Sequence, residues 1–109
     1  MNPYLLLALA VCCEVIATLS LRASDGFSKT LPSVMVVVGY GAAFYLLTQV
    51  LKGLSVGTVY AIWAGAGTAL VAIAGALIFG DRLGWTGAAG VALIVSGVIV
   101  LNISGAASH

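Results

Sequence analysis

Four long apolar runs dominate the sequence and constrain its fold more than any other feature. They cover roughly residues 4–21, 33–51, 58–79 and 87–104. Each has about 18 to 22 residues, and a helix needs about 20 apolar residues to cross the hydrocarbon core of a bilayer. A spanning strand would need only about ten residues and would alternate polar with apolar positions, which none of these runs does. The runs therefore predict an all-α polytopic membrane protein with four transmembrane helices.

The composition excludes several classes of protein. Charged residues make up 6% of the 109 residues and hydrophobic residues 62%, whereas soluble domains carry about 25% charged residues. The runs leave only short loops, so we expect one four-helix transmembrane domain over residues 1–109, with no room for a soluble enzyme domain. The net charge of +1 argues against a nucleic-acid partner, which requires a basic face. We expect no enzymatic activity, cofactor or metal, and the lipid bilayer as a partner.

The short loops make consecutive helices antiparallel neighbours. The amino terminus, the second loop and the carboxyl terminus then share one side of the membrane. Arg22, Lys29 and Arg82 lie on the opposite side from Lys52 and the amino terminus. Positive charge on short loops sets orientation only when one side has a clear excess. This small bias is compatible with insertion in both orientations.

Glu14 is the one charged residue that falls inside a run. It lies ten residues past Tyr4, or about 15 Å along a helix axis, near the middle of the bilayer. A carboxylate at this depth is costly and indicates a functional site; the alternative is a neutral glutamic acid that forms a hydrogen bond between helices. No Lys, Arg or His lies at comparable depth in the four runs. The partner of Glu14 is therefore expected to be a proton or an external cation.

A single intramembrane carboxyl group supports a simple exchange mechanism. Burial disfavours its charged form, so it can hold a proton and release it when a cation binds. A proton and an organic cation that bind the same group compete for it. If the site opens to one side of the membrane at a time, this competition becomes antiport.

Small residues share the helical face of Glu14. Ala10, Ala17 and Thr18 leave space around the carboxylate for a substrate, although small residues also line ordinary helix contacts in membranes. Both interpretations are open for these three positions.

Aromatic residues offer candidate cation contacts. Tyr60 and Trp63 share one face at the start of the third run, and Tyr40 and Phe44 lie four residues apart in the second. Aromatic rings attract organic cations, but Tyr and Trp near a helix end also form the interfacial belt of membrane proteins.

Two pairs of glycines suggest movement and assembly. Gly65 and Gly67 are a candidate helix hinge, with close packing as the alternative. Gly90 and Gly97 lie one heptad apart on a face with Ile94, a candidate for self-association. Four short helices cannot enclose a substrate pathway, and many transporters contain inverted repeats. We see no internal repeat, so an oppositely inserted second copy would supply one.

These features together resemble the small multidrug resistance family of proton-coupled exporters over essentially the whole chain. Each fragment is weak alone, but the combination is highly specific. The matching fragments are Asn2-Pro3-Tyr4, Glu14-Val15-Ile16-Ala17-Thr18, Asp25-Gly26-Phe27-Ser28, Pro32-Ser33, Tyr40, Gly57, Tyr60-Ala61-Ile62-Trp63 and Gly90 to Gly97.

The resemblance implies an antiparallel, dual-topology homodimer in a bacterial inner membrane. It implies that Glu14 from both chains forms one shared site for protons and drug, with Tyr60 and Trp63 as drug contacts. The rest of the binding chamber would contain Ala10, Ala17, Thr18, Tyr40 and Phe44. The guanidinium-exporting branch typically has Trp three residues after the glutamate. Ala17 occupies that position here, so the chain resembles the branch that exports quaternary ammonium compounds.

Two other classes of function stay open. A guanidinium or lipid-carrier exporter would have the same fold. A non-transporting membrane assembly subunit would explain the glycines and short loops, but not an unpartnered glutamate in mid-membrane.

Overall fold

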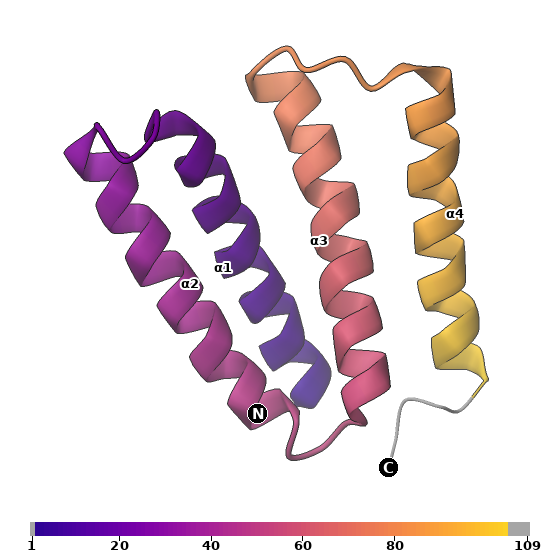
Figure 1. Cartoon of the computed structure of the whole chain (residues 1–109). Coiled ribbons are helices and arrows are strands. Elements are labelled where there is room, and N and C mark those ends of the chain that lie inside the picture. The colour runs from indigo at the N-terminus through magenta and orange to yellow at the C-terminus, as the bar shows by residue number, and fades with distance from the viewer. Residues whose placement is uncertain (1, 105–109) are drawn as a thin grey trace. The chain divides into compact units, whose positions relative to one another are not determined.

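The computed structural model describes residues 2–104 and contains four helices (Figure 1). All four have the length and apolar composition needed to cross a membrane. A helix of about 20 residues rises about 30 Å, which matches the hydrocarbon thickness. The helices are α1 (Pro3–Ala23), α2 (Thr30–Val50), α3 (Val56–Ile78) and α4 (Gly84–Ile103).

Three helices begin two or three residues before the apolar runs that predicted them. Polar residues and glycines such as Thr30, Gly57 and Gly84 lie in these first turns and interrupt the apolar signal. Helix α2 begins at Thr30 and includes Pro32 in its first turn, where a proline removes no helical hydrogen bond. Helix α3 begins after Ser55, whose side chain accepts a hydrogen bond from the backbone N–H of Thr58. Such N-caps satisfy donors that the helix leaves free.

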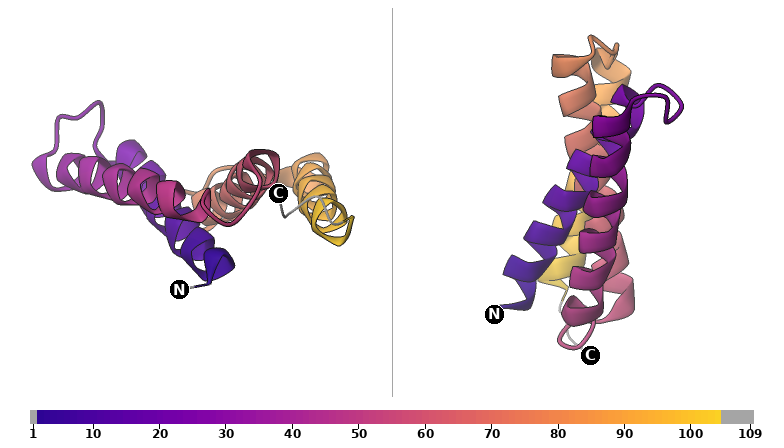
Figure 2. Two further views of the ribbon diagram at one scale, coloured as in Figure 1. Left: turned by 90° about the horizontal axis from the view of Figure 1, so that it is seen from below. Right: turned by 90° about the vertical axis from the view of Figure 1, so that its left-hand side faces the viewer.

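The chain forms two helical hairpins, which are described separately. Helices α1 and α2 form the first hairpin, within residues 1–52, and α3 and α4 form the second, within residues 53–109. Figure 2 shows the two helices of each hairpin running side by side. The short connections agree with antiparallel neighbours.

The first hairpin has a tight turn around Ser24. The Ser24 side chain is fully buried. Its hydroxyl donates to the Leu21 carbonyl at 2.8 Å and accepts from the Phe27 N–H at 3.1 Å. Asp25, Gly26 and Phe27 all have positive φ angles, and the hydrogen bonds to Ser24 hold this unusual backbone. The turn fixes where α2 begins.

The contact between α1 and α2 depends on small residues. Ala10 and Ala17 of α1 and Ala43 of α2 have no exposed surface. Gly39 of α2 faces Ala17, so closely that a methyl group at position 39 would lie 2.8 Å from the Ala17 Cβ. Small residues at such positions let two membrane helices approach closely.

In the second hairpin, α3 and α4 pack closely at Gly65. A methyl group there would lie 2.6 Å from Cγ2 of Val98 and 3.1 Å from Cγ2 of Ile94. Within the described part of the chain, α4 has no buried residue. Helix α4 is therefore the most exposed of the four and leaves a large apolar surface available.

Candidate functional site

Glu14 lies near the centre of α1, eleven residues after Pro3 and nine before Ala23. Its side chain is half-buried. The Oε2 atom is buried and has no hydrogen-bond partner among residues 2–104. The predicted depth and the absence of an intrachain partner therefore coincide in one carboxyl group.

An unsatisfied buried oxygen of this kind is uncommon in folded proteins. Most buried polar atoms have a hydrogen-bond partner, and exceptions often mark a functional group or an absent ligand. A carboxylate in an apolar environment is stabilised by a proton or by a cation. Either ligand would neutralise the charge of the Glu14 carboxylate.

One turn beyond Glu14, α1 and α2 are joined by a hydrogen bond between side chains. The hydroxyls of Thr18 and Tyr40 lie 2.6 Å apart, and either can be the donor. The Tyr40 ring stacks on Phe44, with 6.3 Å between ring centroids and 24° between ring planes. The first hairpin therefore brings Thr18, Tyr40 and Phe44 together, and Thr18 lies one helical turn from Glu14 on α1.

The two alanines predicted beside Glu14 are fully buried. Ala10 and Ala17 each have 0% exposure, and Ala17 contacts the backbone of α2 at Gly39. This contact is direct support for helix packing at Ala17. Its role in a binding chamber stays a proposal.

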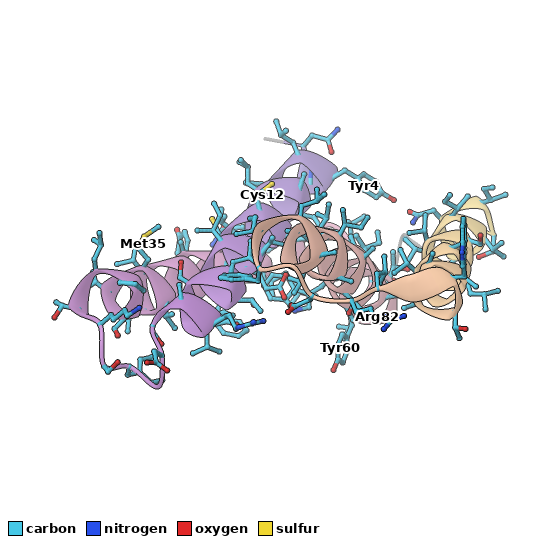
Figure 3. All side chains as sticks on the ribbon, turned by 90° about the horizontal axis from the view of Figure 1, so that it is seen from above. Tyr4, Cys12, Met35, Tyr60 and Arg82 are labelled. Carbon is cyan, nitrogen blue, oxygen red and sulfur yellow. The ribbon has the colours of Figure 1, made fainter. Side chains whose placement is uncertain are left out.

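Tyr60 and Trp63 belong to the second hairpin, at the start of α3. Tyr60 is 69% exposed, and Figure 3 shows its side chain projecting away from the α3 ribbon. Trp63 is half-buried. Both side chains thus lie on the surface of their own hairpin, where an aromatic belt and a cation contact are both possible.

The four predicted functional glycines differ in their surroundings. Helix α3 is continuous through Gly65 and Gly67, which are both buried, and Gly65 packs against α4. The predicted hinge stays a proposal. A methyl group at Gly90 or Gly97 would meet no atom within 4 Å. Ile94, which shares their predicted face, lies against Gly65 within the same chain, so only part of that face is free for a second copy.

The sequence did not single out Gly39 or Ser24. Gly39 lies next to Tyr40 in the middle of an apolar helix, but Gly41 does too, so this signal does not distinguish the two glycines. Ser24 lies in a loop with several polar residues, and its burial follows from the turn that forms around it.

The fold and the site together define a polytopic membrane protein in which a buried oxygen of Glu14, inside α1, has no hydrogen-bond partner among residues 2–104. The family model described as "Small Multidrug Resistance protein" matches residues 2–94. The chain belongs to this family.

Several relatives are similar over nearly their whole length. The chain is 46% identical over 108 residues to the quaternary ammonium compound-resistance protein QacE of Escherichia coli, covering 99% of this chain and 98% of the relative. It is 46% identical, with the same coverage of both chains, to multidrug transporter PA4990 of Pseudomonas aeruginosa. It is 48% identical over 98 residues to the nicotine metabolites export pump subunit NepA of Paenarthrobacter nicotinovorans, covering 90% of this chain and 84% of the relative.

Family membership and the four apolar helices indicate the cellular location of the protein. It is a multi-pass protein of the bacterial inner membrane. These relatives are named as resistance proteins, transporters or pump subunits.

Proposed function

We propose that this protein is a proton-coupled antiporter that exports hydrophobic or quaternary organic cations. The observation that carries the proposal is the buried Oε2 atom of Glu14, which has no hydrogen-bond partner among residues 2–104. The names of the relatives QacE and PA4990 support the same class of substrate.

Glu14 would bind a proton and a cation in turn. Both ligands neutralise the same carboxylate, so each displaces the other. When the site opens alternately to the two sides of the membrane, protons move inwards as cations move outwards. The free energy of the proton gradient then drives export.

Aromatic side chains would hold the apolar part of the cation. The Tyr40–Phe44 pair offers ring faces near the Glu14 turn. Tyr60 presents an exposed ring on α3, with Trp63 three residues further along. A ring face attracts an organic cation by about 0.5 to 2 kcal/mol. The carboxylate and the rings together favour a ligand that is both positively charged and apolar.

The functional unit would be an antiparallel homodimer. Helix α4 has no buried residue in the described part of the chain, and Gly90 and Gly97 have free space beside them. A second copy, inserted in the opposite orientation, would cover this surface and provide a second Glu14. Two carboxyl groups in one site would titrate as a coupled pair.

Other exporters of the same fold remain the second candidate. One relative is named a subunit of an export pump for nicotine metabolites, which is a different substrate class from quaternary ammonium compounds. Guanidinium and lipid-carrier substrates belong to the same group of alternatives. A non-transporting assembly subunit is disfavoured because it gives no role to the unsatisfied Glu14.

Transport in proteoliposomes tests the proposal. A pH gradient, acidic inside, should drive tetraphenylphosphonium into the vesicle lumen only when protein is present, because protons leave the lumen as the cation enters. In the opposite sense, an alkaline interior should drive preloaded tetraphenylphosphonium out of the lumen. The Glu14→Gln protein should show neither movement. Tetraphenylphosphonium flux by this variant equal to that of the wild type would contradict the proposal, and selective flux of guanidinium would favour the second candidate.

A further inference from the structure

Helices α1 and α2 approach each other closely at Gly39. A methyl group at this position would lie 2.8 Å from Cβ of Ala17, 3.2 Å from the Cys13 carbonyl oxygen and 3.4 Å from Cα of Ala17. Two of these three atoms are backbone atoms, which cannot turn aside as the end of a long side chain can. Alanine at position 39 therefore requires α2 to move away from α1.

The atoms that contact Gly39 belong to the turn of α1 that carries Glu14. Cys13 directly precedes Glu14, and Ala17 follows three residues later. Helix α2 thus lies against the backbone beside the carboxyl group. A change in the spacing of the two helices at Gly39 changes the surroundings of Glu14 directly.

The next residue of α2 depends on the same spacing. Tyr40 reaches Thr18 of α1 with a 2.6 Å hydrogen bond between the two hydroxyls. Hydrogen bonds weaken rapidly when their partners separate by a few tenths of an ångström beyond the preferred distance. The stacked Phe44 ring follows Tyr40. Gly39 therefore controls the position of both rings relative to the Glu14 turn.

We propose that Gly39 is a positioning residue that sets the spacing between Glu14 and the Tyr40–Phe44 ring pair, and so determines which organic cations bind. This inference rests on the proposed function. The ring pair is held at one distance from the carboxylate by the Gly39–Ala17 contact and by the Thr18–Tyr40 hydrogen bond. Cations whose charge and aromatic surface match that distance bind best.

Gly41 provides a matched control in the same helix. It lies two residues from Gly39, and a methyl group there would meet no atom within 4 Å. Both substitutions to alanine change the intrinsic helix preference equally. Only Gly39→Ala forces α1 and α2 apart, so a difference between the two variants reports the contact itself.

The test compares tetraphenylphosphonium binding by full-length variants in detergent, measured by calorimetry. We expect Gly39→Ala to raise the Kd about tenfold and Gly41→Ala to change it less than about twofold, because overpacking acts only at Gly39. Gly39→Ala should change the Kd for tetrapropylammonium, which has no aromatic surface, by a smaller factor than the Kd for tetraphenylphosphonium. A general loss of folding would lower both affinities alike.

A second substitution should repair the first. Ala17→Gly removes the Cβ that a methyl group at position 39 would meet at 2.8 Å. We expect the Gly39→Ala/Ala17→Gly protein to bind tetraphenylphosphonium more tightly than the Gly39→Ala protein. Ala17→Gly in the Gly41→Ala background should give no such gain. If the Gly39→Ala protein does not fold, the double variant and the hydroxyl variants Tyr40→Phe and Thr18→Val still test the inference.

The hydroxyl variants act on the same hydrogen bond. Tyr40→Phe and Thr18→Val should each weaken tetraphenylphosphonium binding. The double variant should bind tetraphenylphosphonium as tightly as the single variant with the lower affinity, because both substitutions remove the same hydrogen bond. Fully additive losses would overturn the inference.

The outcomes separate the inference from the proposed function. If the Gly39→Ala and Gly41→Ala proteins bind tetraphenylphosphonium with equal affinity, while wild-type binding depends on Glu14, the role of Gly39 is overturned and the proposed function stands. Wild-type protein that binds no tetraphenylphosphonium, or binds it equally well after Glu14→Gln, would overturn the proposed function and this inference together.

Discussion

At the scale of single residues, the most informative position is Glu14, the one charged residue that lies inside an apolar run. Glu14 could be predicted as a site because a carboxylate in an apolar run is rare and costly. Its Oε2 atom has no hydrogen-bond partner among residues 2–104, and its role as a site stays a proposal. The Thr18–Tyr40 hydrogen bond could not be predicted, because it depends on how α1 and α2 are rotated about their axes.

The hydroxyl of Tyr40 should contribute to the stability of the first hairpin. We expect Tyr40→Phe to lower the free energy of unfolding by about 1 kcal/mol, the usual net value of one hydrogen bond. Ring stacking on Phe44 is retained in this variant. Unfolding in sodium dodecyl sulfate, followed by circular dichroism, measures the change.

Tyr45→Phe is the control for this prediction. Tyr45 is 65% exposed, so loss of its hydroxyl should change the stability by less than a few tenths of a kcal/mol. Equal effects of the two substitutions would show that the Thr18–Tyr40 contact does not stabilise the hairpin.

At the scale of helices and turns, the sequence predicts the four helices more accurately than the contacts between them. The four apolar runs correspond to four helices, and the early starts of α2, α3 and α4 involve residues such as Thr30 and Gly84 that carry no hydrophobic signal. Packing faces were harder to predict, because small residues fit a binding chamber, a hinge and a close helix contact equally well. Ile94 illustrates this: it shares the predicted self-association face of Gly90 and Gly97, but it lies against Gly65 of the same chain.

Gly65 should be intolerant of a side chain. In a Gly65→Ala protein the added methyl group would lie 2.6 Å from Cγ2 of Val98, and a β-branched side chain in a helix has few alternative rotamers. We expect a loss of about 1 to 3 kcal/mol of stability from overpacking. Gly57→Ala is the control, because a methyl group there meets no atom within 4 Å. The same denaturation assay should show no loss for Gly57→Ala, and a similar loss for both variants would refute the packing role of Gly65.

The stability of the turn between α1 and α2 should depend on the hydroxyl of Ser24. Ser24→Ala removes a donor to the Leu21 carbonyl and an acceptor for the Phe27 N–H. Because the site is buried and the turn has three positive φ angles, we expect a loss of about 1 to 3 kcal/mol.

Ser28→Ala serves as the comparison for the turn. The Ser28 hydroxyl makes a single 3.3 Å hydrogen bond to the Ser24 carbonyl and is exposed. Its loss should cost less than about 0.5 kcal/mol. A smaller effect at Ser24 than at Ser28 in the denaturation assay would contradict the role given to Ser24.

At the scale of the whole molecule, the distribution of positive charge bears on topology. Arg22, Lys29 and Arg82 oppose Lys52 and the amino terminus, a difference too small to fix one orientation. The sequence could predict this balance because it needs only loop positions. The self-association face predicted at Gly90 and Gly97 stays a proposal, since the surfaces that would meet belong to two chains.

Dual insertion should be visible with carboxyl-terminal reporters. Fusions to alkaline phosphatase, active only outside the cytoplasm, and to a green fluorescent protein, active only inside, should both give signal. Replacing Lys29 and Arg82 by alanine leaves one positive charge against two. Positive charges favour the cytoplasmic side, so fluorescence should rise and phosphatase activity fall. Signal from only one wild-type fusion would refute dual insertion for this chain.

The competition between proton and cation at Glu14 is the central claim, and proton release on cation binding tests it most directly. Tetraphenylphosphonium is added to the protein in weakly buffered detergent solution, and the change in pH is recorded. We expect wild-type protein to bind the cation and to release protons as it binds, with tighter binding as the solution is made more alkaline. The Glu14→Gln protein should neither bind the cation nor release protons. Undiminished binding by the Glu14→Gln protein, or wild-type binding without proton release, would contradict the claim.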